Sequence, residues 1–281
     1  MASYLVNAIN VGGFELGEAD RVLYIFTAEK GLLKAVAKGA RKPGSKMSGR
    51  SDVLSVNQLQ LSTGRTFEII TQAQTLENFP ALRSNLASLS YGLYYAELTN
   101  CFGAGLEEES QSFFQLLIES LSLLAHTELD PLILCMEFEF ALLDFLGYKP
   151  ELTYCISCRN VLTEYKLSKF NLDLGGIVCL DCAKKGRRFQ VREGSENHEG
   201  SAEYNELLRG VHITPLVWKS LVLAAENFYS ESAQHVELAT NMHMAYEAAQ
   251  RILQSYIEQR AGKRFKSLDV LSQIQSMQAR S

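Results

Sequence analysis

Residues 155–182 read CISCRNVLTEYKLSKFNLDLGGIVCLDC, a stretch that opens and closes with a Cys-x-x-Cys pair. Each pair can place two thiolates on one metal ion from a tight turn, and a second pair across a hairpin completes a tetrahedral sulfur cage. Two disulfides would need an oxidising compartment, and a thioredoxin-like redox motif would need one pair on a βαβ unit. The spacing therefore predicts one zinc ion, held by Cys155, Cys158, Cys179 and Cys182.

A zinc site with four cysteine ligands builds structure and does not catalyse, because no position stays open for water or substrate. A nucleobase deaminase would need His-x-Glu beside an open zinc site, whereas His198 and Glu199 are adjacent. The P-loop pattern Gly-x-x-x-x-Gly-Lys-Ser/Thr is absent from the sequence. We therefore expect no enzymatic activity. The thiolate charge can be offset by the cations that follow the module, Lys184, Lys185, Arg187 and Arg188.

Length and composition suit two domains, or one domain with an insert, since the chain has 281 residues of which 47% are hydrophobic. The most apolar run, residues 132–146, is interrupted by three acids, so we expect no membrane span. Residues 1–10 lack the basic flank of a signal peptide. We expect a cytoplasmic protein, in which reduced cysteines are available to metal.

Short runs rich in β-branched and aromatic residues fill the first 77 positions. The runs are separated by Gly12-Gly13, Gly17, Lys30-Gly31 and the hairpin signal at residues 62–65. Five strands in so short a segment predict a small barrel, with the OB-fold as the leading choice and an SH3-like barrel as the alternative. The expected strands are residues 4–11, 21–27, 32–38, 53–61 and 66–71, within a domain of residues 1–78.

A basic segment lies between the third and fourth expected strands, in a chain whose net charge is −5. It carries no acid before Asp52, and its glycines, serines and proline predict a loose loop. A loose basic loop on a small barrel is suited to follow a phosphate backbone, although a solvated surface loop is the alternative. The predicted DNA-binding residues are Lys30, Lys34, Lys38, Arg41, Lys42, Lys46 and Arg50.

Helical periodicity begins near residue 79 and predicts a helical domain over residues 79–281, into which the zinc module, residues 151–192, is inserted. Leucines 82, 86, 89 and 93 repeat on one face, and a helix that starts at Pro131 is apolar almost all round. A long helix is expected over residues 233–259, where His235 and His243 are too scattered to bind metal. The whole chain is thus α+β and multidomain.

A second basic cluster follows the long helix, beside an apolar stripe that includes Met242 and Tyr256. Cations and an apolar groove would suit an acidic peptide with a hydrophobic end and a free carboxylate, although cations at a helix C-terminus also complement its dipole. The predicted partner-binding residues are Arg260, Lys263, Arg264 and Lys266.

Taken together, these features resemble the bacterial RecO family of recombination mediators. The resemblance rests on Phe26-Thr27, Gly31, residues 37–43 with Ser45 after them, the two cysteine pairs and the closing Lys266-Ser267-Leu268. It implies an OB-fold, a helical domain with a zinc module, and binding and annealing of single- and double-stranded DNA. It also implies the partners RecR and the C-terminal tail of the single-stranded-DNA-binding protein, recombinase loading during repair, and association with the nucleoid.

The alternative function is a zinc-ribbon module that binds nucleic acid or protein in transcription or translation, which the basic barrel loop does not exclude. Binding and annealing of a labelled oligonucleotide would separate the two.

Overall fold

The computed structural model of the protein describes residues 3–185, 209–226 and 240–278. The chain forms two compact units, Met1–Leu134 with Phe265–Ser281, and Cys135–Arg264. The division falls within the helix α5, Pro131–Phe145. Several residues considered above lie outside the described ones: Arg187, Arg188, His198, Glu199 and His235.

The first unit begins with a closed five-stranded barrel, whose strands follow the order β1-β2-β3-β5-β4. All pairs are antiparallel except β3 with β5. An SH3-like meander would place β3 beside β4, so this order confirms the OB-fold. The strands are β1 Ser3–Leu16, β2 Asp20–Thr27, β3 Gly31–Ala37, β4 Val56–Ser62 and β5 Glu68–Glu77.

Every second side chain along the strands points into the barrel and fills its interior, because successive side chains in a strand point to opposite faces. Leu23 and Ile25 of β2 and Ala35 and Ala37 of β3 belong to the buried cluster inside the barrel. Their neighbours along each strand therefore point outward.

The first strand is longer than predicted, because Gly12-Gly13 does not end it. Beyond a bulge between Asn10 and Gly12, β1 leaves β4 and continues along β2 as far as Leu16. A Cβ on Gly13 would lie 2.5 Å from the Val22 carbonyl oxygen. Glycine is therefore required here for the close approach of two strands, not for a turn.

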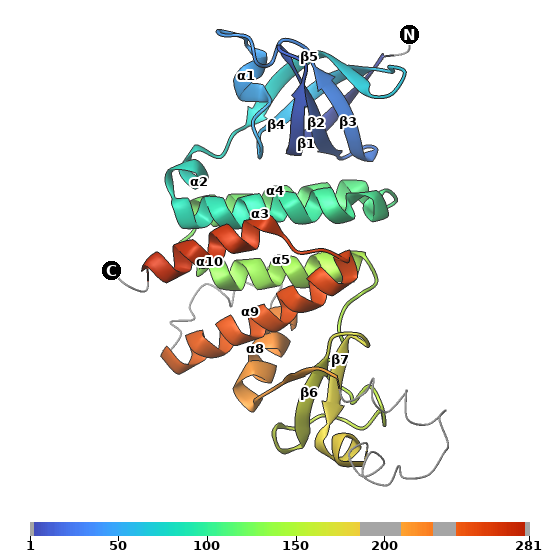
Figure 1. Ribbon diagram of the computed structural model, residues 1–281, viewed down its shortest axis with the longest axis vertical. Coiled ribbons are helices and arrows are strands. Elements are labelled where there is room, and N and C mark those ends of the chain that lie inside the picture. The colour runs from blue at the N-terminus through green and yellow to red at the C-terminus, as the bar shows by residue number, and fades with distance from the viewer. Residues whose placement is uncertain (1–2, 186–208, 227–239, 279–281) are drawn as a thin grey trace. The chain divides into compact units, whose positions relative to one another are not determined.

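Helices cover one side of the barrel (Figure 1). Phe26 of β2 packs edge-on against Phe113 of α4, with ring centroids 5.4 Å apart. The Cβ position of Gly103 lies 3.1 Å from Leu32 of β3. The elements of this layer are α2 Pro80–Ser84, α3 Leu86–Phe102, the short 3-10 helix η1 Gly103–Leu106 and α4 Ser110–His126.

The predicted leucine stripe at 82, 86, 89 and 93 is not one helical face. The Asn85 side chain caps α3 by accepting from the Ala87 and Ser88 N–H groups, so Leu82 belongs to α2. Leu86 and Leu93 are 62% and 38% exposed. Buried tyrosines and Leu98 form the packed side of α3 instead.

The C-terminal helix α10, Lys266–Gln278, packs on α3. Phe265 is buried with its ring centroid 5.9 Å from that of Tyr94. The Glu97 carboxylate accepts from the Lys266 and Ser267 N–H groups and from the Ser267 hydroxyl, at 3.2, 2.9 and 2.6 Å. An acid from α3 therefore caps the N-terminus of α10.

The second unit combines helices with a three-stranded sheet of order β7-β6-β8. Trp218 of α8 donates from Nε1 to the Leu152 carbonyl at 2.9 Å, which ties the helices to the cysteine-bearing segment. Among the described helices, none has both the length and the hydropathy to cross a membrane. The elements are η2 Glu164–Lys166, β6 Leu167–Asn171, β7 Gly176–Cys179, β8 Val211–His212, α8 Pro215–Glu226 and α9 Thr240–Ala261.

Candidate metal centre and nucleic-acid interface

The four predicted cysteine ligands lie together in the second unit. Cys155 and Cys158 sit on a tight turn closed by Arg159, whose N–H donates to the Cys155 carbonyl at 2.8 Å and whose φ is +59°. Cys179 ends β7, and the helical residues 180–185 carry Cys182. The turn thus places the first cysteine pair beside the second pair, which lies at the end of β7 and in the helical residues after it.

Their sulfur atoms have the spacing of a metal cage. All four Sγ atoms lie within 4.8 Å of one another, and those of Cys158 and Cys179 are 3.8 Å apart. Four sulfurs placed about 2.3 Å from a zinc ion in a tetrahedron would be about 3.8 Å apart. The donor set and its dimensions thus fit a tetrahedral ion of that size.

Backbone donors and burial act on these thiols in opposite directions. Burial raises the pKa of the Cys155 thiol, but backbone N–H groups, among them that of Cys179 at 3.3 Å, outweigh it and lower the pKa to about 7. Burial, reinforced by hydrogen bonds with Cys179 and Cys158, raises the pKa of Cys182 to about 12. Four crowded sulfurs become thiolates together only when a cation lies between them, so metal binding at this site would release protons.

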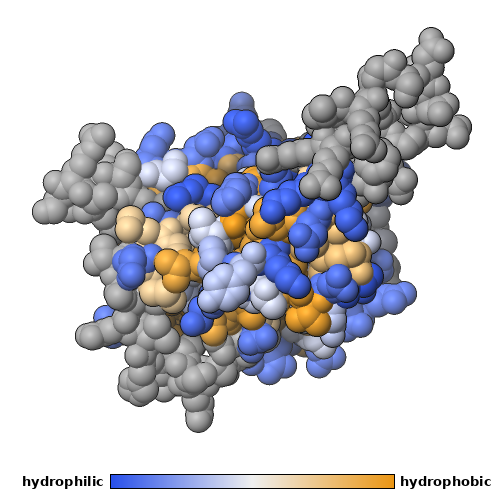
Figure 2. Space-filling view, turned by 90° about the horizontal axis from the view of Figure 1, so that it is seen from below, coloured by the Kyte–Doolittle hydropathy of each residue, from blue (hydrophilic) through white to orange (hydrophobic). Residues whose placement is uncertain are grey.

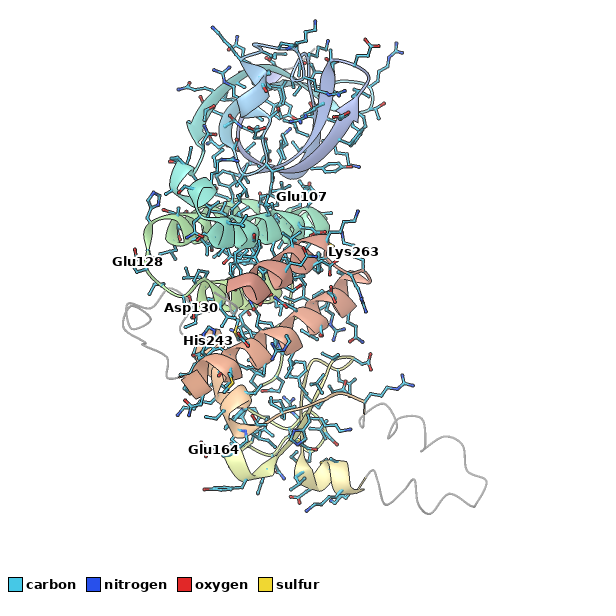
Figure 3. All side chains as sticks on the ribbon, turned by 60° about the vertical axis from the view of Figure 1, so that its left-hand side comes forward. Glu107, Glu128, Asp130, Glu164, His243 and Lys263 are labelled. Atoms are coloured by element: carbon cyan, nitrogen blue, oxygen red, sulfur yellow. The ribbon has the colours of Figure 1, made fainter. Side chains whose placement is uncertain are left out.

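No other group of three or more His, Cys, Asp or Glu side chains in the described residues could share a metal ion. Glu107 lies near the start of α4, whereas Glu128 and Asp130 lie past its other end (Figure 3). His243 and Lys263 lie towards opposite ends of α9.

The predicted basic segment is held more firmly than expected. The Gly39 N–H donates to Asp20 Oδ1 at 2.7 Å, and the Asn10 side-chain amide donates to the carbonyls of Arg50 and Asp52 at 2.7 and 2.9 Å. The helix α1, Met47–Arg50, forms within the segment. The expectation of a loose loop is therefore wrong, because residues distant in sequence bind both of its ends.

Three of the seven predicted cations already have partners on the barrel. The Lys30 ammonium lies 3.7 Å from the centroid of the Tyr4 ring. Arg41 Nη2 lies 3.0 Å from Glu15 Oε2, and its Nη1 donates to the Gly17 carbonyl at 2.9 Å. Lys34, on β3, lies 5.2 Å from the centroid of the Tyr24 ring.

Three further lysines, Lys38, Lys42 and Lys46, are exposed. Within the described part of the chain, no carboxylate lies at salt-bridge distance from their ammonium groups. Arg50, the seventh predicted cation, is half-buried at the end of α1. The strongest unneutralised positive charge of the segment is therefore the group of three lysines.

An aromatic cluster on the barrel was not predicted from the sequence. The ring centroid of Phe14 lies 6.0 Å from that of Tyr24 and 6.4 Å from that of Phe67. The sequence places Phe14 and Tyr24 on the first two strands and Phe67 directly before the fifth, but it does not show that the three rings meet. The three rings form one surface only because of the strand register, which could not be predicted from the sequence.

Arg260, a predicted partner-binding cation, is engaged within the second unit. Its Nη2 donates to the carbonyls of Asp173 and Leu172 at 2.6 and 3.4 Å. Its guanidinium lies 4.7 Å from the centroid of the Tyr256 ring and 5.6 Å from that of Tyr148. Arg260 therefore joins α9 to the hairpin that carries the cysteine module.

The predicted groove does not have Tyr256 as an exposed wall. Tyr256 is 3% exposed, so it is a core residue and not the wall of a groove. Lys263 and Arg264 are exposed beyond the end of α9, and Lys266 is exposed at the start of α10. In the coloured part of Figure 2, hydrophobic residues alternate with hydrophilic ones, which does not by itself mark an apolar docking site.

Comparison with known proteins relates most of the chain to a family of DNA repair proteins. Residues 1–79 match the family Recombination protein O N terminal, and residues 83–196 match Recombination protein O C terminal. The DNA repair protein RecO of Nostoc sp. is 28% identical over 96% of this chain and 95% of its own. The RecO of Symbiobacterium thermophilum is 30% identical over 66% of this chain and 74% of its own length. The RecO of Dehalococcoides mccartyi is 36% identical over 64% of this chain and 70% of its own length.

These matches, together with a five-stranded barrel followed by helices and a four-cysteine module, define the class as multidomain DNA repair and recombination proteins. The chain belongs to the RecO family. The resemblance stated from the sequence is confirmed.

Proposed function

We propose that this protein binds single- and double-stranded DNA, anneals complementary strands and helps to load recombinase during repair, without catalysing a reaction itself. The observation that carries the proposal is the exposed group of Lys38, Lys42 and Lys46, whose charge no carboxylate of the described chain neutralises. Phosphate contacts by such lysines supply most of the affinity for a strand, irrespective of its sequence. Annealing needs only that two strands meet on a surface that reduces their repulsion, so no nucleotide hydrolysis is required.

Salt dependence tests this assignment. Each phosphate contact on a single strand contributes about −0.7 to the slope of log affinity against log salt, so three lysines account for about −2. We expect the triple variant K38Q/K42Q/K46Q to have a slope shallower by about 2 and to anneal labelled complementary strands more slowly. The matched control K149Q/K166Q/K219Q removes equal charge from exposed lysines elsewhere and should behave as the parent protein. Equal slopes in the two triple variants would place the DNA site elsewhere.

Zinc is the cofactor that we propose, one ion per chain, held by Cys155, Cys158, Cys179 and Cys182. The spacing of the sulfurs and the absence of an open ligand position support a structural role. The ion would fix the cysteine-bearing turn against β7 and would not take part in chemistry.

Two partners follow from family membership as proposals, RecR and the C-terminal tail of the single-stranded-DNA-binding protein. For the tail we retain Lys263 and Arg264, which are both exposed. Charge reversal at Arg264 should weaken binding of a fluorescent tail peptide without changing helix content. Equal binding by the reversed and parent proteins would reject the site. The proposed location is the cytoplasm, on the nucleoid during repair.

A further inference from the structure

The outer face of the barrel presents a continuous row of side chains across four strands. Phe14 of β1 lies opposite Val22 of β2, Val22 lies opposite Val36 of β3, and Val36 lies opposite Ile69 of β5. These residues alternate with the inward-pointing Leu23 and its equivalents, so the row lies on the outer side of the barrel wall, where Phe14 is exposed, Val36 and Ile69 are half-buried and Val22 is covered. An apolar strip therefore crosses the barrel at this level.

Aromatic rings stand along this strip. Phe14 is 42% exposed, and Tyr24 and Phe67 are half-buried. The planes of Tyr24 and Phe67 are inclined to that of Phe14 by 54° and 74°, so the rings do not stack face to face on one another.

A positive charge accompanies the rings. Lys34 is the register partner of Tyr24 across β2 and β3, and its side chain is exposed. Aromatic faces flanked by cations suit a ligand that offers flat π-systems and anionic linkers in alternation, which is the chemistry of a single nucleic-acid strand. An apolar peptide would make no use of Lys34, and a duplex keeps its base faces stacked inside.

We propose that Phe14, Tyr24 and Phe67 form a stacking platform for the unpaired bases of single-stranded DNA. The proposal rests on the proposed function and adds to it, since the lysines of the basic segment bind phosphates of either DNA form and the rings distinguish one from the other. Stacking occupies the face of a base and leaves its Watson–Crick edge exposed. A strand held in this way stays able to pair, which is what annealing requires.

Removing the rings while keeping apolar side chains separates stacking from hydrophobic contact. The variant F14L/F67L should bind an oligo(dT) strand about 100-fold more weakly at fixed salt, from about tenfold for each ring. Its binding to a blunt duplex should change less than twofold. Its salt slope on oligo(dT) should equal that of the parent protein, because no phosphate contact is lost. The control L5A alters another exposed apolar residue of the barrel and should change none of these values.

An abasic strand of equal length tests the same idea without mutation. The parent protein should bind it about as weakly as F14L/F67L binds oligo(dT), because the phosphates remain and the bases are gone. If the double variant folds poorly, F14W takes its place, and the fluorescence that it adds to that of Trp218 in the parent protein should be quenched on adding oligo(dT). Equal affinity of the parent protein for abasic and dT strands, or unquenched F14W at saturation, would overturn the platform. A parent protein that binds none of the DNA ligands would reject the proposed function instead.

Discussion

A buried acid in the second unit should make its stability depend on pH. Glu137 of α5 is 5% exposed, and burial raises its pKa from 4.5 to about 7. Its Oε1 atom has no hydrogen-bond partner among the described residues. Burial, and the nearby charge of Glu137, also raise the pKa of Tyr246 on α9. We predict that replacing Glu137 by Gln removes a destabilising term that grows with pH.

The sign follows from proton binding. Between pH 4.5 and 7 the folded chain holds the Glu137 proton and the unfolded chain does not, so the free energy of unfolding falls as pH rises. The difference between pKa values of 4.5 and about 7 corresponds to about 3 kcal/mol at about 1.4 kcal/mol per pH unit. Of this, about 2.5 kcal/mol is lost between pH 5 and pH 8. Glutamine resembles the protonated acid and does not ionise, so E137Q avoids the loss.

Urea denaturation of the full chain, followed by circular dichroism at pH 5, 6, 7 and 8, measures the effect. The parent protein should lose about 2.5 kcal/mol more than E137Q over this range, and the difference already present at pH 5 should be below about 1 kcal/mol. The control E164Q changes an exposed acid of the same unit and should keep the parent pH dependence. A parallel pH dependence in E137Q and the parent, or a less stable E137Q at pH 8, would refute the reasoning.

Three further predictions concern the cap, the metal centre and the basic segment. E97Q removes a carboxylate that accepts two backbone N–H groups of α10, so the unit should lose about 1 kcal/mol and the α10 amides should exchange hydrogen faster; unchanged exchange would contradict this. C158S should lower the zinc content from one ion per chain to none by elemental analysis and speed proteolysis near residues 151–185, while DNA binding persists; retained zinc would contradict the ligand set. E15Q should free Arg41 and steepen the salt slope by about 0.7; an unchanged slope would mean that Arg41 does not reach DNA.

Local chemistry explains which parts of the structure could be predicted. The Cys-x-x-Cys spacing carries its own geometry, so Cys155 and Cys179 could be placed near each other before any fold was known. Helix α5 was expected to be apolar all round, and residues along its length are buried, including Phe138 and Leu142.

Long-range pairing explains what could not be predicted. Gly12-Gly13 has the local appearance of a turn, but the backbone of Val22 makes it a strand. Leu86 and Leu93 have helical spacing with Leu82, but a helix start at Asn85 leaves both of them exposed. In each case a partner distant in sequence, or a cap, determines the outcome.

The capping of α10 by Glu97 has a consequence for how the chain is made. Residues from Phe265 onward belong to the same compact unit as the barrel, although the whole of the second unit is translated between them. During synthesis the barrel and α3 leave the ribosome long before their last helix exists, so the surface of α3 that receives α10 waits uncovered. The unit Cys135–Arg264 can therefore fold before the barrel-bearing unit receives its last helix. A premature stop near residue 264 would therefore destabilise the unit that contains the N-terminal barrel, because it removes α10.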